Sequence, residues 1–397
     1  MRDRPVNSPL FKHFSLDPDF VFLNHGSFGA CPRVVLETQR ELRARLEAQP
    51  VRFYEREVSG LLTQARQRLA EFVNASPDDL GLVTNATTGV NTVLGAITLG
   101  RGDELLVTDH EYNACRNALE FVAKRAGASV VVVQIPFPVK DSQTIIDAIM
   151  ARVTPRTRLM LVDHITSPTG IVMPVDAIVE ALENLGVDTL VDGAHAPGMV
   201  PLDLRRMRPA YYTGNCHKWL CTPKGSAFLY VREDKQSEMR PLNISHGANM
   251  PLSMGSRFRL EFDWTGTCDP TPWLCIPAAL DTMASFYANG WADVREHNRA
   301  LALKARDLLC EHLNQEPPCP DHMMGSLAAV VLPERSDSDP TCLDPLHNAL
   351  FHDWKIEVPV FAWPALNMRL LRVSAQVYNH PEQYKYLCFA LQTANAR

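Results

Sequence analysis

The sequence predicts an α/β fold in which a mostly parallel sheet, flanked by helices, is followed by a smaller α+β domain. Two observations support this prediction. Short apolar runs alternate with longer amphipathic stretches from about residue 80 to residue 231, as in βα units. Past about Ser245 the sequence becomes rich in Gly and Pro, which indicates a domain boundary. At 397 residues the chain is long enough for two domains.

Four apolar runs in the first region are predicted to be buried parallel strands, because Gly, Asp or Pro flanks each of them. The runs are Leu105–Thr108, Val130–Val133, Leu159–Val162 and Thr189–Val191. Between the last two, Met173–Leu185 carries apolar residues at helical spacing, and Gly186 follows as a stop signal. The pattern therefore predicts a helix that connects two strands of one sheet.

The second region begins with a Gly- and Pro-rich connection that extends from His246 to Pro272. A helix-rich segment follows from Trp273 to about Leu313, and two strand-like runs come after it. These runs are Leu327–Leu332 and Met368–Val373. We therefore divide the chain into an N-terminal arm (residues 1–20), a large domain (21–245), and a linker with a small C-terminal domain (246–397).

Charge and hydropathy exclude several classes of partner. The formal net charge is −6 at pH 7, and no basic run is longer than Arg205–Arg206, which disfavours binding to duplex nucleic acid. No apolar stretch reaches the roughly 18 residues of a membrane helix, and the first residues lack the apolar run of a secretory signal. We therefore expect a cytoplasmic protein that binds small molecules, and neither nucleic acid nor a membrane.

The ten cysteines are spread from Cys31 to Cys388 and include no Cys-x-x-Cys pair, so we interpret them as reduced thiols. One group has residue types that bind metals: Cys310, His312, Cys319 and His322. Its spacing fits no standard zinc pattern. We therefore predict no metal site.

The densest chemical signal lies between Val191 and Lys224. Asp192 stands at the carboxyl end of a predicted strand, where open α/β sheets place their ligand sites. Lys218 follows 26 residues later in a short polar turn. A lysine amine can form a Schiff base with the aldehyde of pyridoxal 5′-phosphate (PLP), and a carboxylate can keep the pyridine nitrogen protonated so that the ring accepts electrons. This pair predicts a PLP enzyme with Lys218 and Asp192 as catalytic residues.

Three motifs carry a resemblance to a known family: Asp192–His195, Gly214–Trp219 and Thr108–Tyr112. They are similar to the class V aminotransferase and cysteine desulfurase superfamily, and in particular to its isopenicillin N epimerase-like branch. The resemblance extends over nearly the whole chain, from Phe22 to Ser374. It implies the PLP-dependent transferase fold type I, with a mostly parallel seven-stranded sheet, a Schiff base at Lys218, and Asp192 as the partner of the pyridine nitrogen.

A phosphate site is predicted where Val83–Asn91 follows a strand and opens a helix. Free backbone N–H groups, hydroxyl groups and the helix dipole can converge there on a dianion. Thr87 and Thr88 supply the hydroxyl groups, and a role as N-caps is compatible with phosphate binding. The resemblance favours phosphate binding by Thr88 and its neighbours.

The resemblance assigns further cofactor contacts by position. It places His195 near the phenolic oxygen of PLP, and Ser167 where cysteine desulfurases carry an Asn against the same oxygen. Asn215 and His217 correspond to phosphate contacts. Thr267 corresponds to a residue that relatives contribute from a second subunit to the same phosphate, so the resemblance also implies a homodimer.

A ring is expected to stack on the pyridine face of PLP. The candidates are His110, which alignment to desulfurases favours, and Tyr112, which the epimerase-like branch favours; the sequence leaves both open. Arg372 resembles the arginine that holds the substrate carboxylate, a task for which its planar fork is suited. Asn24, in the loop from Asn24 to Gly29, is a further candidate for substrate binding.

The predicted core reaction is removal of the Cα proton of an amino acid by Lys218 as general base. Return of the proton to the opposite face gives an epimerase, expulsion of a β-sulfur gives a lyase, and protonation of the cofactor gives a transaminase. Cysteine desulfurases need a mobile cysteine shortly before the substrate arginine. Here Cys342 lies 30 residues before Arg372, which disfavours persulfide chemistry.

The resemblance favours an isopenicillin N epimerase-like epimerase. The alternatives are a carbon–sulfur β-lyase that acts on a cysteine conjugate or sulfoxide and, less favoured, an aminotransferase. A binding module without catalysis is a further alternative, which the intact set of Asp192, His217, Lys218 and Arg372 argues against. An epimerase needs a second acid or base opposite Lys218, and the sequence identifies none.

Overall fold

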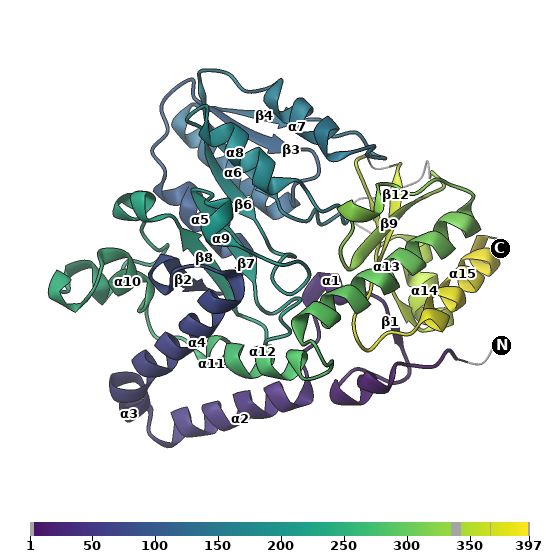
Figure 1. The fold of residues 1–397 in the computed structure, drawn as a ribbon, viewed down its shortest axis with the longest axis horizontal. Helices are drawn as coiled ribbons and strands as arrows, with labels where there is room; N and C mark the ends of the chain where they lie inside the picture. The colour runs from purple at the N-terminus through teal and green to yellow at the C-terminus, as the bar shows by residue number, and fades with distance from the viewer. Residues whose placement is uncertain (1–3, 335–342, 366, 396–397) are drawn as a thin grey trace.

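The computed structural model describes residues 4–334, 343–365 and 367–395, so Cys342 lies outside the described residues. Within them, seven strands form the main sheet in the order β2-β8-β7-β6-β5-β3-β4. Helices cover both faces of this sheet, and a smaller unit packs beside it (Figure 1). The expected α/β architecture with a mostly parallel seven-stranded sheet is confirmed.

The strands of the main sheet are β2 (Leu80–Val83), β3 (Glu104–Thr108), β4 (Ser129–Val133), β5 (Thr157–Asp163), β6 (Asp188–Asp192), β7 (Tyr211–Asn215) and β8 (Ala227–Val231). The four predicted runs correspond to β3, β4, β5 and β6. Strand β8 is antiparallel to both of its neighbours, and the other pairs are parallel. Because β3, β5, β6 and β7 are parallel to one another, their carboxyl ends lie along one edge of the sheet.

The helices are α1 (His25–Phe28), α2 (Arg33–Ala48), α3 (Pro50–Arg52), α4 (Val58–Val73), α5 (Ala86–Ala96), α6 (Asn113–Ala126), α7 (Ser142–Met150), α8 (Val175–Glu183), α9 (Leu204–Met207), α10 (Arg257–Phe262), α11 (Thr271–Leu274), α12 (Ile276–Ala284), α13 (Trp291–Leu313), α14 (Pro345–Trp354) and α15 (Pro381–Asn395). None of these described helices combines the length and the apolar character that a membrane span requires.

Helix α8 is shorter at both ends than the predicted helix Met173–Leu185. The Met173 N–H donates to the carbonyl of His164, which keeps Met173 outside the helix, and Pro174 is the N-cap. At the other end Gly186 has φ +72°, a conformation that glycine adopts without strain, and its N–H donates to the carbonyl of Glu183.

The C-terminal region contains a second sheet. In the described part of the chain this sheet has the order β11-β12-β9, formed by Val360–Ala362, Arg369–Ser374 and Leu327–Leu332, and both pairs are antiparallel. Helices α13 and α15 pack beside it (Figure 1). Strand β1 (Val21–Phe22) pairs in parallel with β10 (Ile356–Glu357), so the first strand of the chain joins the C-terminal region. The domain boundaries given above remain a prediction.

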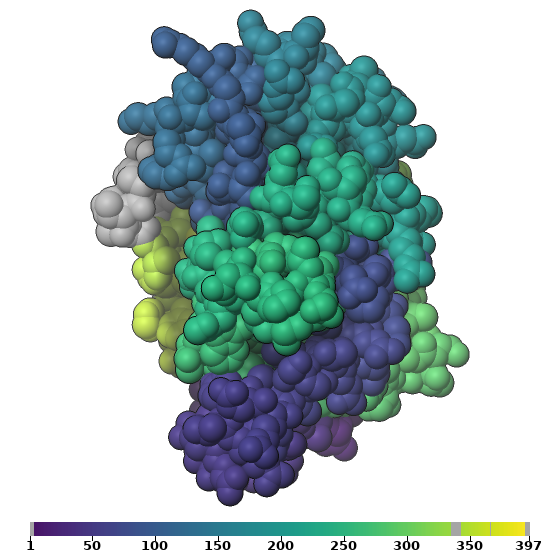
Figure 2. Space-filling model, turned by 90° about the vertical axis from the view of Figure 1, so that its left-hand side faces the viewer, coloured from purple at the N-terminus to yellow at the C-terminus, as the bar shows by residue number. Residues whose placement is uncertain are grey.

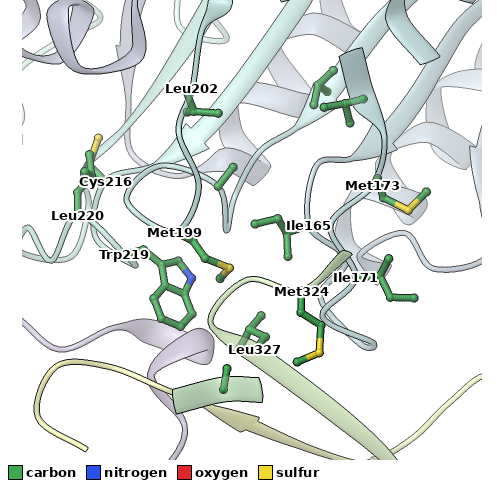
Figure 3. Packing of buried hydrophobic residues seen from close by; sticks show 14 of the residues in the cluster. Ile165, Ile171, Met173, Met199, Leu202, Cys216, Trp219, Leu220, Met324 and Leu327 are labelled. Atoms are coloured by element: carbon green, nitrogen blue, oxygen red, sulfur yellow. The ribbon is translucent and has the colours of Figure 1, made fainter. Parts of the chain in front are cut away.

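One apolar cluster joins the loops of the main sheet to the second sheet (Figure 3). It includes Met199 and Trp219 on one side and Met324 and Leu327 on the other. Each of these side chains is at most 3% exposed. Since fully burying a large apolar side chain contributes roughly 1.5–3 kcal/mol, this cluster holds Arg372 on β12 in a fixed position relative to Lys218.

Candidate active site

Polar side chains gather at the edge of the main sheet where the parallel strands end. Asp163 is the last residue of β5, Asp192 the last of β6, and Asn215 the last of β7. Lys218 lies in the turn after β7, and Tyr112 precedes α6 after β3. The structure therefore brings the predicted catalytic residues Asp192 and Lys218 to neighbouring strand ends.

The amine of Lys218 contacts a histidine. Its Nζ lies 3.1 Å from Nε2 of His195, and the indole N–H of Trp219 donates to Nδ1 of the same ring at 3.3 Å. Because the indole can only donate, the neutral His195 ring carries its hydrogen on Nε2, which then donates to a neutral lysine amine. Burial, assisted by the charge of Arg372, lowers the pKa of Lys218 to about 8, and burial lowers the pKa of His195 well below its usual value.

The backbone around Lys218 is held by the N-terminal segment. Nε2 of His25 lies 3.0 Å from the Lys218 carbonyl oxygen, and Nδ1 lies 2.8 Å from the hydroxyl oxygen of Tyr378. Gly29 has φ +74°, and a Cβ there would come within 2.3 Å of the His217 carbonyl oxygen. These close contacts explain why a glycine stands at position 29 and why the turn that carries Lys218 is rigid.

Asp192 is 2% exposed and has two hydrogen-bond donors. The Ala194 N–H donates to Oδ1 at 2.9 Å, and the Cys115 thiol donates to Oδ2 at 3.1 Å. Burial raises the pKa of Asp192, while these two donors and the charge of Lys218 oppose the rise. A cationic group placed beside Asp192 would therefore be bound strongly, because it would restore the charge balance of a buried carboxylate.

The predicted phosphate residues meet at the N-terminus of α5. Asn85 is the N-cap, and its Oδ1 accepts from the Thr88 N–H at 2.8 Å. Oδ1 of Asn215 accepts from the Ala86 N–H at 2.9 Å, so the end of β7 lies against the same helix terminus. Thr87 is in the first turn, and the Thr88 hydroxyl lies 3.0 Å from that of Thr84. Hydroxyl groups and N–H groups at a helix N-terminus suit a phosphate dianion.

His217 lies beside this end of the site. Its Nδ1 is 2.9 Å from the carbonyl oxygen of Ser226, so Nδ1 carries the hydrogen and donates it. Burial lowers the pKa of His217 to about 4, so the ring is neutral at neutral pH. The remaining nitrogen, Nε2, is then an acceptor and can hold a water or a protonated group.

Arg372, which is 5% exposed, lies at the other end of the site on β12. Its Nη1 donates to the backbone carbonyl and the hydroxyl of Ser167, and its Nη2 donates to the Ser27 hydroxyl at 3.2 Å. Nε is buried and lacks a hydrogen-bond partner among the described residues. Ser27 in turn donates to Asn24 at 2.6 Å, and Asn24 donates to Glu357 at 2.9 Å. Asn24 is thus connected to the predicted carboxylate site through Ser27.

The two candidates for the stacking ring differ in their surroundings. His110 is fully buried, its Nδ1 lies 2.9 Å from the Thr169 hydroxyl, and its ring packs edge-on against Phe137 and Trp363. Tyr112 is 45% exposed, and it raises the pKa of Arg372, against the lowering by burial. Tyr112 therefore lies near Arg372 with a largely exposed ring, whereas His110 is packed inside, and the identity of the stacking ring stays a prediction.

Two acidic residues of this site were missed in the sequence. Glu111, between the two ring candidates, is 8% exposed, and Asp163 is 3% exposed. Asp163 pairs with Asp192 in the register of β5 and β6, so both carboxyl groups lie on the same face of the sheet. Asp163 could have been found in the sequence, because it follows a predicted strand as Asp192 does. The contact of Trp219 with His195 had no such signal, since it depends on the path of a turn.

The geometry fits PLP. The pyridine nitrogen requires a buried carboxylate, the aldehyde requires a neutral amine, and the phosphate requires a helix N-terminus. Asp192, Lys218 and the start of α5 meet these requirements from β6, β7 and the segment after β2. The buried Nε of Arg372, which has no partner in the described chain, fits the carboxylate of an amino-acid substrate. The fold and the site together define a cofactor-dependent enzyme of amino-acid chemistry.

Comparison with known proteins agrees with this class. The family model "Aminotransferase class-V" matches residues 21–317. The chain is 37% identical to isopenicillin N epimerase of Amycolatopsis lactamdurans, over 95% of this chain and 96% of that protein. It is 32% identical to a probable chloroplastic L-cysteine desulfhydrase of Arabidopsis thaliana, over 94% of this chain and 82% of that protein.

Solved structures have the same fold. A complex of the cystine C–S lyase C-DES with cysteine persulfide superposes with a TM-score of 0.78 at 24% identity, over 94% of this chain and 97% of that one. The cysteine desulfurase CsdA of Escherichia coli also gives 0.78, at 21% identity and 98% coverage of both chains.

The chain belongs to the class-V aminotransferase family. Family membership makes it a PLP-dependent enzyme and confirms the fold class and the resemblance found in the sequence.

Proposed function

We propose that the protein is an epimerase that inverts the configuration at Cα of an amino acid, with the amino-acid side arm of isopenicillin N as the first substrate to test. The observation that carries the proposal is the placement of two proton-transfer groups on either side of Asp192. Lys218 follows β7 and Tyr112 follows β3, whereas Asp192 ends β6 between them. An epimerase needs one group on each face of Cα, and we infer that these two groups, which approach from opposite directions along the sheet edge, take those positions.

In this proposal Lys218 and Arg372 fix the reacting carbon. PLP, when bound, supplies an aldehyde for the substrate amino group and a ring that accepts the electron pair left at Cα. Arg372 binds the substrate carboxylate through charge-assisted hydrogen bonds and so orients the Cα–H bond. Lys218, with a pKa of about 8, has far more free amine near neutral pH than an ordinary lysine and takes the proton from one face. Asp192 holds a proton at the ring nitrogen.

In this proposal Tyr112 is the proton-transfer group on the face of Cα opposite Lys218. Arg372 is within electrostatic reach of both Lys218 and Tyr112, because its charge lowers the pKa of Lys218 and the ionised form of Tyr112 raises the pKa of Arg372. In the proposed arrangement a carboxylate bound at Arg372 has its Cα between the lysine amine and the phenol. The phenol returns a proton to the face opposite Lys218, and the reverse reaction uses the two groups in the opposite order.

A carbon–sulfur β-lyase is the second candidate. The similarity to an L-cysteine desulfhydrase supports it, since the same Lys218 chemistry precedes loss of a β-sulfur. A lyase needs no acid or base opposite Lys218, so a catalytic role of Tyr112 in inversion distinguishes the two reactions.

We also propose a homodimer in the cytoplasm. Leu252 and Met254, before α10, are 64% and 63% exposed. They adjoin a groove of about 950 Å³ whose lining includes Met254. The segment that contains α10 stands out from one face of the molecule, above α2 and α3 (Figure 2). Thr267, in the same connection, is also exposed and is available to a second copy.

One experiment tests the reaction. The purified protein loaded with PLP is incubated in D₂O with isopenicillin N in one reaction and with L-cysteine in another. An epimerase converts the first substrate to its side-arm epimer with one deuterium at Cα and releases little pyruvate from the second. Release of pyruvate and sulfide without inversion would replace the epimerase by the lyase. Return of both substrates unlabelled would contradict both.

A further inference from the structure

Behind Asp192 lies a cluster of buried acidic groups that the proposed mechanism does not use. Oxygen atoms of Glu111 and Asp192 and the Cys115 sulfur all lie within 4.8 Å of one another. Asp163 lies beside Asp192 in the register of β5 and β6. Three carboxyl groups are thus enclosed in one small volume, where full ionisation would place three negative charges in contact at low dielectric.

The hydrogen bonds of the cluster are unequally distributed. Asp192 accepts from Cys115 and Ala194. In the described chain, neither oxygen of Glu111 accepts from a donor, and neither does Oδ2 of Asp163. Glu111 and Asp163 both lie next to Asp192, so their two carboxyl groups are close enough to influence each other's pKa. Because an ionised carboxylate is only an acceptor, two such groups can bond to each other only if one of them carries a proton.

The charged groups around the cluster are too few to balance three carboxylates. The titratable groups that face it are Cys115 and Arg116 on α6, Tyr212 on β7, and Lys218 after β7. Arg116 is already paired with Glu120 at 2.8 Å. Burial and mutual repulsion raise the pKa of Glu111 and of Asp163 well above the usual values. Asp192 accepts two hydrogen bonds that favour its charged form, whereas burial and repulsion outweigh the influence of the Tyr112 backbone N–H and of Arg116 on Glu111.

We propose that Glu111 and Asp163 each hold a proton at neutral pH and form a neutral pair, which leaves Asp192 as the single carboxylate that faces the ring nitrogen of the cofactor. The two residues are positioning residues, because they act through Asp192. They keep the remaining negative charge on the one group that the ring nitrogen contacts. Their role rests on the proposed role of Asp192, whereas their protonation does not depend on it.

The first test measures protonation in the full-length protein. In E111Q and D163N an amide replaces the carboxyl group at nearly constant shape. We expect infrared spectra of the wild type at neutral pH to contain the band of a protonated carboxyl group, both with and without PLP. The band should weaken in each variant and disappear in E111Q/D163N. Asp103→Asn is the matched control, because Asp103 is hydrogen-bonded to Arg158 and its pKa is lowered, so the band should be unaffected.

A second measurement uses the pH dependence of stability. Carboxyl groups with raised pKa values hold protons in the folded state that the unfolded chain releases above about pH 4. The free energy of unfolding therefore falls as the pH rises from there through the raised pKa values. This fall should be smaller in E111Q/D163N than in the wild type.

The third measurement concerns the cofactor. If the pair is neutral, E111Q/D163N should bind PLP within about twofold of the wild type and leave the ¹⁵N chemical shift of the ring nitrogen unchanged, whereas Asp192→Asn should change both. A wild type without the infrared band, or a tenfold loss of PLP affinity in E111Q/D163N, would overturn the proposal. A wild type that shows the band but takes up no PLP would instead contradict the proposed function. Should the double variant not fold, each single variant gives the same comparison.

Discussion

The edge of the sheet around Asp192 and the connection around α10 are built in opposite ways. At the sheet edge, Asp192, His195 and the turn of Lys218 are buried or held by hydrogen bonds from the same chain. In the connection, Leu252 and Met254 are mostly exposed, and Thr267 faces solvent. The difference agrees with the proposed homodimer, in which one chain supplies the groups that act at Cα and a second copy covers the exposed connection.

The largest effect is expected inside the sheet edge, at Lys218. Lys218→Ala should lower turnover by at least about 1,000-fold, because one amine is both the covalent anchor of PLP and the base. The measurement is borohydride reduction of the loaded protein followed by mass spectrometry, which should locate the cofactor on residue 218 in the wild type only. Lys224→Ala is the control, since Lys224 donates to the carbonyl of Gly29 and is a second lysine close to the same turn. Substantial turnover in Lys218→Ala would show that Lys218 is not the base, and the chemistry could then not be assigned to the enclosed sheet edge.

Tyr112→Phe should lower inversion by about 100-fold, since it removes one of two proton-transfer groups. In D₂O, Lys218 of the variant should still exchange the Cα proton of one epimer for deuterium, and this epimer should retain its configuration. The other epimer should return unlabelled. Tyr386→Phe is the control and should leave both rates unchanged. It removes a hydroxyl that donates to the Trp354 carbonyl oxygen. Inversion at the wild-type rate in Tyr112→Phe would show that Tyr112 only covers the ring.

The pKa of Lys218 predicts a pH dependence of cofactor uptake. Only the neutral amine attacks an aldehyde, and a lysine with a pKa of about 8 loses its neutral form about tenfold per pH unit below that value. The rate of PLP uptake by the cofactor-free protein should therefore rise about 50-fold from pH 6 to pH 8 and then level off. An ordinary surface lysine would give a rate that continues to rise to about pH 10. A continued rise would mean that the amine is solvated, and that the sheet edge is less enclosed than the contacts of His195 indicate.

Much of the enclosed edge could be predicted from the sequence, because its elements have local signals. Asp192 and the phosphate turn follow strands that are bounded by Gly, Asp or Pro, and Lys218 follows at a short distance along the chain. The fold class follows from the same alternation of strands and helices. The resemblance added roles to these positions, and the family comparison confirms the class.

What could not be predicted depends on contacts between distant segments. The choice between His110 and Tyr112 depends on which ring is packed against Phe137 and Trp363, and Trp363 lies more than 200 residues away in the sequence. Glu111 gives no sign in the sequence that it faces Asp163 from across the sheet edge. Burial of a charged residue by remote segments has no local pattern, so these positions became visible only in the folded chain.

A substitution at Thr267 tests the role of the exposed connection around α10. Thr267→Ala should weaken PLP binding by about tenfold, the loss expected for one charge-assisted hydrogen bond to a phosphate. Mixed dimers sharpen the comparison. A dimer of one Lys218→Ala chain and one Thr267→Ala chain contains one site with an intact lysine and an intact threonine from the partner. Half of the sites of the purified heterodimer should therefore bind PLP with wild-type affinity, as measured by titration. No rescue would place Thr267 within its own chain's site or outside any site.

The smallest effect is expected at the Cys115 thiol, which donates to Oδ2 of Asp192. A serine hydroxyl is a stronger donor than a thiol, so Cys115→Ser should stabilise the carboxylate and weaken its hold on the ring proton by a few-fold. The midpoint of the ¹⁵N titration of the ring nitrogen should move to lower pH, and in Cys115→Ala, which has no donor, to higher pH. Cys310→Ser on α13 should leave the midpoint unchanged, because that thiol contacts the Glu316 carbonyl oxygen. Equal midpoints in all three variants would mean that the Cys115 thiol does not set the basicity of Asp192.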